Sequence, residues 1–218
     1  MDALETAPDN SRRQFFKLAG GIAGAGMVLS ACRRTPPSDT YVGSGDAALL
    51  NYLYIINQVE AAFYTQAAIT TYYGMTQSEN DLLLDLRDQE IAHREFLRTY
   101  LGSNVSSPIT VNFSAVTFAD RTNTLTHATI IEDLATAAIN GAIQLFSDTS
   151  IIPTLAKMAT VEARHAAYAR DLLTANSFSD STVTDANGLN NYIAPLAGMT
   201  KIEQYIQTHF DVSKLPTY

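Results

Sequence analysis

The sequence has one cysteine, few basic residues and no tryptophan, and these shortages exclude several classes of protein. A single cysteine cannot form an internal disulfide, which excludes disulfide scaffolds and cysteine-rich zinc modules. Lys and Arg number 14 against 22 Asp and Glu, so the formal net charge is −8 and nucleic acid is not an expected partner. With only four histidines, any metal site must rely mainly on carboxylates.

The rest of the composition is that of a folded protein. Of the 218 residues, 46% are hydrophobic and 17% are charged. This is enough apolar material for a packed core and too little charge for a disordered chain. The length predicts one domain with additional segments, at roughly 150 residues per domain.

The N-terminus has the layout of an export signal. Arg12 and Arg13 form a basic pair, and residues 19–31 form a Gly- and Ala-rich apolar run. A helix that spans a bilayer needs about 20 apolar residues, so this run is too short to cross one. We predict a twin-arginine signal over residues 1–32 and a periplasmic or cell-envelope location.

The lone cysteine lies where such a signal would be cleaved. Leu29-Ser30-Ala31-Cys32 resembles the lipobox of bacterial lipoproteins, in which the cysteine becomes a lipidated first residue. Lipidation of Cys32 would attach the protein to a membrane, with residues 33–45 as a linker. The alternative is a small free cysteine with no such role.

Hydrophobic periodicity predicts an all-α protein. Apolar residues recur at spacings of three and four in segments at about 46–73, 77–101, 124–146 and 151–175. The first two segments, and the last two, are joined by only a few residues, so each pair should form an antiparallel hairpin. Residues 102–121 are long enough to cross the length of a helix, which predicts a four-helix bundle with a long central crossover.

A C-terminal extension follows this predicted bundle, which spans residues 46–175. Residues 176–218 are interpreted as polar loop with one short helix at about 200–210, where Thr200-Lys201-Ile202-Glu203 has a capping-box pattern. No strand pattern stands out, although residues 109–113 have a high β propensity.

Acidic residues interrupt the apolar stripe of each predicted long helix. These residues are Glu60, Glu90, Glu132 and Glu162. A buried carboxylate without a partner costs several kcal/mol, so this placement calls for compensating cations. His93 and His165 follow two of these glutamates at the third position, which gives two inward-facing Glu-x-x-His motifs.

The spacing of the glutamates predicts a shared site. Glu60 precedes Glu90 by 30 residues and Glu132 precedes Glu162 by 30 residues, and the midpoint of each pair falls at a predicted hairpin turn. Residues at equal distance from a turn lie at equal height in a hairpin. The two hairpins repeat with an offset of 72 residues and would bring their ligands to one level.

The predicted ligand set favours iron. Four carboxylates balance the charge of two divalent cations, and two neutral imidazoles complete the set. These mainly oxygen ligands suit iron or manganese better than zinc, whose structural sites prefer sulfur and nitrogen. We predict two Fe ions, with Mn as the alternative. His127, His209 and Asp133 match no motif and are interpreted as residues of the surface or of helix ends.

These motifs resemble those of the ferritin-like superfamily, over about residues 46–175. In its di-iron and di-manganese bundles, two helices each provide a Glu and the other two each provide Glu-x-x-His. Among its branches the chain is similar to exported bacterial ferritin-like proteins related to desiccation-associated proteins. The resemblance implies helices that run up, down, down and up. It also implies that Glu90 and Glu162 bridge two metals, while the other Glu and His of each hairpin complete one metal each.

Two further features bear on the resemblance. Glu162-Ala163-Arg164-His165 resembles the Glu-x-Arg-His motif of the wider di-iron group, but Val161 stands where an Asp is often found. This departure leaves one His without an assigned hydrogen-bond partner.

Tyr64 lies one turn after Glu60, where relatives have a redox or hydrogen-bonding tyrosine. The alternative for Tyr64 is a packing role with a satisfied hydroxyl.

The resemblance leaves two classes of function open. Many relatives oxidise Fe(II) or an organic substrate with dioxygen or peroxide, which implies a ferroxidase or peroxidase type of oxidoreductase. The alternative is a non-catalytic envelope protein of stress or desiccation tolerance, in which the metal pair is structural. The sequence does not predict an oligomeric state.

Overall fold

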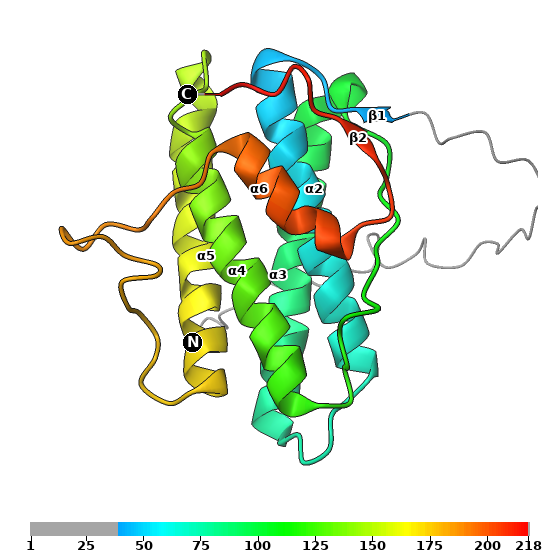
Figure 1. The fold of residues 1–218 in the computed structure, drawn as a ribbon, viewed down its shortest axis with the longest axis vertical. Coiled ribbons are helices and arrows are strands. Elements are labelled where there is room, and N and C mark those ends of the chain that lie inside the picture. The colour runs from blue at the N-terminus through cyan, green and yellow to red at the C-terminus, as the bar shows by residue number, and fades with distance from the viewer. Residues whose placement is uncertain (1–38, 218) are drawn as a thin grey trace, which may run out of the picture. The chain divides into compact units, whose positions relative to one another are not determined.

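The computed structural model describes residues 39–217, and the predictions for Arg12, Arg13 and Cys32 lie outside them. The long helices are α2 (Gly45–Ile69), α3 (Gln77–Leu101), α4 (Arg121–Ala142) and α5 (Ile152–Leu173). They pack side by side as a bundle (Figure 1). A short helix, α6 (Pro195–Ile202), lies across its outside. The predicted all-α four-helix bundle is confirmed.

The order of the helices in space follows from the lengths of their connections. The turns between α2 and α3 and between α4 and α5 are short, so each pair is an antiparallel hairpin. The chain after α3 returns along the whole bundle before α4 begins, so α3 and α4 run in the same direction (Figure 1). This is the predicted up, down, down, up arrangement.

Buried polar side chains of α2 hold the crossover in place. Asn51 is 1% exposed, accepts a hydrogen bond from the backbone N–H of Ser106, and donates to the backbone oxygens of Val42 and Asn104. Gln58 accepts from the backbone N–H of Ile109. Backbone groups of an irregular segment need such partners when they are covered. The crossover is therefore fastened to the helix at the centre of the core.

The helix ends are set by local capping. Thr76 and Glu79 form a reciprocal capping box at the start of α3. The helix α4 begins at Arg121 because the Asp120 side chain accepts from the N–H of Asn123, and it ends at Ala142. The predicted bounds of about 124 and 146 were therefore too late at both ends.

The C-terminal helix is the clearest correction to the sequence-based prediction. It spans Pro195–Ile202 and not about 200–210, because Pro195 occupies the first turn, where no backbone donor is needed. Thr200 lies inside the helix, and its hydroxyl donates to the backbone oxygen of Leu196 instead of capping. Gly198 packs against α2: a Cβ there would lie 1.8 Å from the hydroxyl oxygen of Tyr52.

Two short strands join the ends of the described chain. β1 (Thr40–Tyr41) pairs in parallel with β2 (Phe210–Asp211), a pairing that the sequence pattern did not predict. The adjacent Val42 is 1% exposed and belongs to the core. The last part of the segment expected to be a linker, residues 33–45, is therefore built into the folded domain. Among residues 39–217, no helix is long and apolar enough to cross a membrane.

Candidate metal centre

Six side chains predicted as ligands come from the four long helices. They are Glu60 on α2, Glu90 and His93 on α3, Glu132 on α4, and Glu162 and His165 on α5. The four glutamates are fully buried, at 0% exposure. The exposed fraction is 5% for His165 and 15% for the side chain of His93. Four acidic groups thus lie in the core of a bundle whose other buried residues are mostly apolar.

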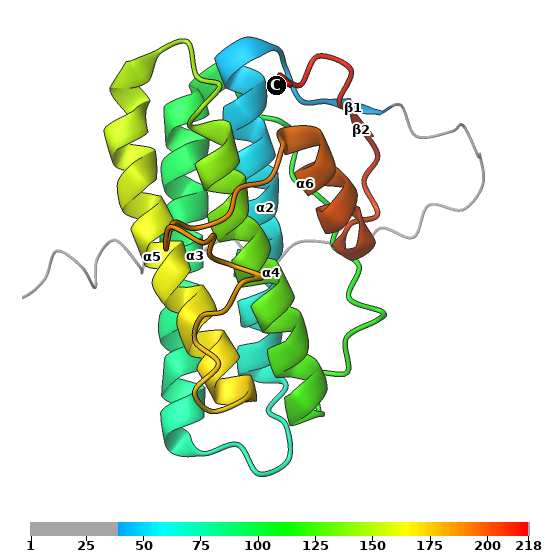
Figure 2. The ribbon, with the colours of Figure 1, turned by 60° about the vertical axis from the view of Figure 1, so that its left-hand side comes forward.

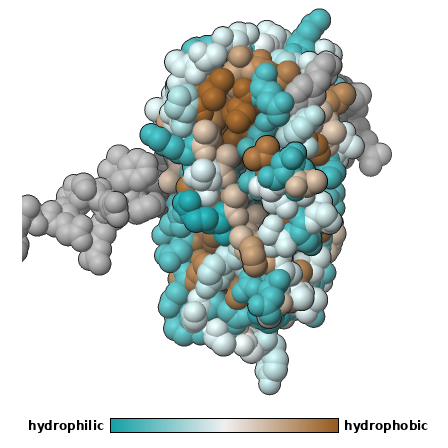
Figure 3. Space-filling model, turned by 90° about the vertical axis from the view of Figure 1, so that its left-hand side faces the viewer, coloured by the Kyte–Doolittle hydropathy of each residue, from teal (hydrophilic) through white to brown (hydrophobic). Residues whose placement is uncertain are grey.

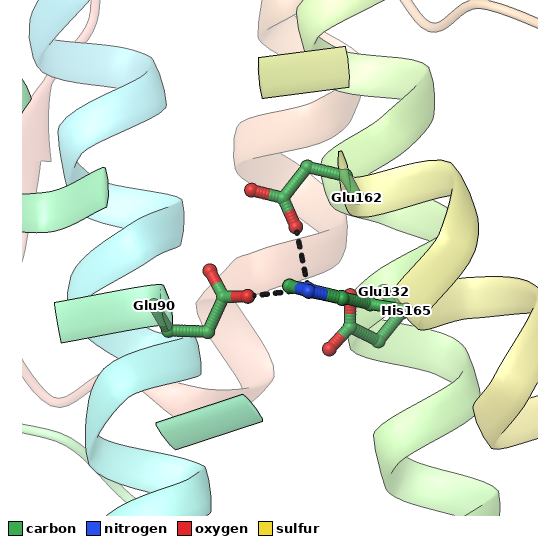
Figure 4. Close-up of side chains that lie close together, drawn as sticks. All are labelled: Glu90, Glu132, Glu162 and His165. Carbon is green, nitrogen blue, oxygen red and sulfur yellow. Dashed lines mark ion pairs between the residues drawn. The ribbon is translucent and has the colours of Figure 1, made fainter. Parts of the chain in front are cut away.

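His165 lies at the centre of the best-defined part of this cluster. Its Nδ1 is 2.7 Å from Oε1 of Glu90, 3.5 Å from Oε2 of Glu162 and 3.8 Å from Oε2 of Glu132. The carboxylates of Glu90 and Glu162 point toward its imidazole (Figure 4). One ligand atom from each of these four residues lies within 4.8 Å of all the others. The four can therefore surround a single ion.

A second histidine faces the same two central carboxylates. Nδ1 of His93 is 2.7 Å from Oε1 of Glu162 and 3.5 Å from Oε2 of Glu90. Glu90 and Glu162 therefore each turn one oxygen toward His165 and the other toward His93. This is the arrangement expected of carboxylates shared between two adjacent sites.

Glu60 belongs to the cluster but is not one of the four residues around His165. Its Oε2 accepts a hydrogen bond from Nδ2 of Asn57 at 2.9 Å. Burial raises the pKa of Glu60 well above its ordinary value, and the charges of Glu162, Glu90 and Glu132 raise it further. The carboxylate therefore lies within electrostatic reach of the others, although it is outside the four-residue set.

The converging ligand atoms lack ordinary hydrogen-bond partners. Within residues 39–217 these atoms are both carboxylate oxygens of Glu90, one oxygen each of Glu60, Glu132 and Glu162, and Nδ1 of His165. Nδ1 of His165 and Oε1 of Glu90 are close, at 2.7 Å, but are not aligned as a hydrogen bond. Buried polar atoms are normally paired, so lone pairs that converge in this way fit a cation between them.

Two neighbouring residues that the sequence reasoning missed orient the ligands. Nε2 of His165 lies 3.1 Å from Oε1 of Gln89, the residue before Glu90 on α3. Because the amide oxygen only accepts, Nε2 must carry the proton, which leaves the lone pair of Nδ1 free for a metal. Gln89 thus fills the role that Val161 left unassigned. Asn57 holds Glu60 in the same manner on α2.

Tyr64 contacts the cluster directly. Its hydroxyl donates to Oε1 of Glu132 at 2.5 Å, and its side chain is fully buried. Burial and the neighbouring Glu132 raise the pKa of Tyr64 well above its ordinary value, so the phenol holds its proton.

Of the other histidines, His127 is half-buried with Nδ1 2.7 Å from the hydroxyl of Tyr205, and His209 is exposed. Neither belongs to the cluster.

Without a metal, protons compensate the buried charge. Burial lowers the pKa of the histidines, but contacts with Glu162 and Glu90 outweigh it and raise the pKa of His93 to about 10 and of His165 to about 11. Burial raises the pKa of Glu162, but the two histidines outweigh it and lower this pKa to about 2. Burial also raises the pKa of Glu132 well above its ordinary value. A divalent cation would displace these protons.

Fold and cluster together define a class: a four-helix bundle with a buried carboxylate and histidine centre that is compatible with a metal site. The model of the ferritin-like domain family matches residues 45–175, and the chain belongs to this family. The superfamily resemblance drawn from the Glu-x-x-His motifs is thereby confirmed. A comparison with curated proteins finds no match.

Proposed function

We propose that this protein is a di-iron carboxylate oxidoreductase that reacts with dioxygen or peroxide, of the ferroxidase or peroxidase type. One observation carries the proposal: Glu90 and Glu162 both lie between the two histidines. Each of these glutamates has one carboxylate oxygen near His93 and the other near His165. Oxygen ligands with one nitrogen per metal suit iron, with manganese as the alternative. Bound iron would supply the electron transfer that side chains cannot perform.

The residues of the chain would bind and orient the metals. Glu132 and His165 would hold one ion, Glu60 and His93 the other, and the two shared carboxylates would lie between them. Tyr64 would keep Glu132 in position and hold a proton next to it. The full burial of the four glutamates excludes bulk water, which strengthens every charge interaction in the site. His93, with 15% side-chain exposure, marks the side from which a small oxidant would enter.

The test is the oxidation of Fe(II) by peroxide, followed by absorbance with the full chain. The wild type should turn over, and Glu90→Ala and Glu162→Ala should both abolish turnover because each removes a carboxylate that serves both ions. Glu95→Ala is the matched control, since Glu95 pairs with Arg94 and Arg98 on the same helix and is not a predicted ligand. Turnover that survives in both centre variants would contradict the proposal.

A second candidate function is a metal pair that only stabilises the bundle of an envelope stress or desiccation protein. The complete burial of the four carboxylates favours it, because a structural ion needs no route for a substrate. Under this alternative, removing the metal lowers the midpoint of thermal unfolding, but the loaded wild type shows no peroxide turnover.

We also propose export by the twin-arginine route and lipid attachment at Cys32, on the basis of the sequence alone. Replacing Arg12 and Arg13 by Lys should retain the protein in the cytoplasm, as judged by cell fractionation. Cys32→Ser should release an exported protein from the membrane fraction. A wild type found only in the cytoplasm would contradict both proposals.

A further inference from the structure

A cleft of about 850 Å³ lies on the outside of the α4 and α5 hairpin, away from the buried glutamates. The segment after α5 runs back over α5 and α4 toward α6 (Figure 2), and residues of this segment and of α6 complete its wall. Figure 3 views the side on which α5 lies. Hydrophobic residues gather in the upper part of this face, and weakly hydrophobic ones continue down its middle between hydrophilic margins. The size is that of a site for a small organic molecule.

The wall of the cleft is fastened by a buried arginine. Arg170 of α5 is 9% exposed and contacts Asp133 of α4 at 2.7 Å. It also contacts Asp180 at 2.5 Å, and its Nε donates to the backbone oxygen of Ser177. At the other end of the segment, the N–H of Ile193 donates to the backbone oxygen of Ala137. The cleft is therefore preformed.

Asp133 is half-buried and paired, which corrects its interpretation as a solvent-facing residue.

Two polar atoms in the lining of the cleft are buried without a partner. Thr136 is 7% exposed, and its hydroxyl has no hydrogen-bond partner within residues 39–217. The same holds for Oδ1 of Asp133, whose other oxygen pairs with Arg170. The two residues are three apart on one helix and face the same way. A bound ligand with hydrogen-bond donors would pair both of these oxygen atoms.

Part of the remaining lining is apolar, and polar side chains of the covering segment and of α6 form much of the rest. Ala163, Ala166 and Ala167 present only methyl groups from α5, and Ile130 and Phe178 lie at the same cleft. The patch formed by the three alanines has no long side chains and can accommodate a planar ring, and aromatic rings bury a large area on such a surface. We propose that the cleft binds a planar aromatic molecule with hydroxyl groups, whose ring lies on the alanines and whose hydroxyls donate one to Asp133 and one to Thr136.

The test uses resorcinol as the probe. Ligand-observed NMR measures its binding to the full chain. Resorcinol dimethyl ether keeps the ring but has no donor, and should bind at least about tenfold more weakly, the effect of losing a hydrogen bond to a charged group. Cyclohexanediol keeps the hydroxyls but not the planar ring, and should also bind more weakly. Equal binding of either control, or tighter binding of a simple sugar, would overturn the proposal.

Three variants place the binding in the cleft. Ala167→Leu fills the alanine patch and should weaken resorcinol binding at least about tenfold, because it displaces the ring. Thr136→Val removes the unpaired hydroxyl and should weaken it severalfold. Thr129→Val is the matched control, since the Thr129 hydroxyl on α4 is also unpartnered among the described residues but does not line the cleft. Binding that Ala167→Leu leaves unchanged would show that the site lies elsewhere. The metal-free chain serves for every titration, so the outcome does not depend on the proposed iron centre.

Discussion

The two halves of the candidate metal centre carry the same residue types but are not equally arranged to bind an ion. In the half formed by Glu132 and His165, the histidine side chain is 6% exposed and already lies among three carboxylates. In the half formed by Glu60 and His93, the histidine side chain is 15% exposed, and Glu60 lies outside the four-residue set. An internal repeat in the sequence thus produces one preorganised half and one looser half. The half with His165 should bind an ion more tightly, because its side chains need less ordering on binding.

Removal of a shared carboxylate is expected to have the largest effect. Glu90→Gln should lose both ions, because Glu90 turns one oxygen to each histidine. Losing a hydrogen-bond partner of a ligand costs about tenfold to a hundredfold in metal affinity, and losing a shared ligand should cost more. Mass spectrometry of bound metal checks this result. Retention of one full ion by Glu90→Gln would show that Glu90 is not shared.

Removal of one histidine at a time should separate the two halves. His93→Ala should leave about one ion per chain, held by the half with His165, because that set of four ligands is intact. His165→Ala should lower the affinity for the first ion, because the preorganised set has lost its central nitrogen. Stepwise titration with Fe(II) or Mn(II) under anaerobic conditions measures both. Identical titration curves for the two variants would remove the distinction between the halves.

The stability of the metal-free protein and its affinity for metal should respond to pH in opposite directions. A free histidine loses its proton at a pH of about 6.5, but folded His93 keeps its proton up to about pH 10. The folded metal-free chain then binds more protons than the unfolded chain, so its stability should fall as the pH rises through this window. The free energy of unfolding should fall by at most about 1.4 kcal/mol per pH unit for each histidine.

Metal binding should show the opposite trend, because the ion competes with these protons. The gap between the unfolding midpoints of loaded and metal-free protein should therefore widen from pH 6.5 to pH 9, within the interval that the raised pKa of His93 defines. Calorimetry in buffers of different ionisation enthalpy should record proton release on metal binding. A constant gap with no proton release would contradict the close contact of the histidines with Glu90 and Glu162.

The partner of His165 should matter less than the ligands themselves. Gln89→Leu removes the acceptor that fixes the proton on Nε2, and metal affinity should fall by about tenfold. This loss of metal affinity lies at the low end of the tenfold to hundredfold range for such partners, because Gln89 is exposed and water can replace its oxygen. Competition with a chelator measures it. Asn57→Leu is the matched variant in the other half, and it should weaken only the second ion.

The smallest effect is expected at Tyr64. Tyr64→Phe removes one buried hydrogen bond to Glu132, which contributes about 1 kcal/mol to stability. The midpoint of thermal unfolding should fall by about 2–4 °C in a chain of this size, while both ions remain bound. A loss of metal from Tyr64→Phe would show that Tyr64, and not only Gln89, prepares the tighter half.

The sequence was sufficient to predict the bundle, its topology and the set of residues that meet in it. Helical periodicity and hairpin spacing are local and regular, so the chain order alone places Glu60, Glu90, Glu132 and Glu162 at one height. The start of α6 was missed because a polar capping pattern at Thr200 competed with the less conspicuous signal of Pro195. Gln89 was missed because one polar residue on an exposed helix face carries no signal of its own. Asp133 was misassigned because its partner Arg170 and the covering segment come from distant positions.

The metal content of the full chain after anaerobic loading with Fe(II), measured by mass spectrometry beside Glu90→Ala and Glu162→Ala, tests the candidate metal centre most directly. We predict about two Fe per wild-type chain, in keeping with the ligand set of di-iron bundles, and almost none in either variant. A wild type that binds no metal, or variants that bind as much as the wild type, would contradict the assignment of these six residues as a metal centre.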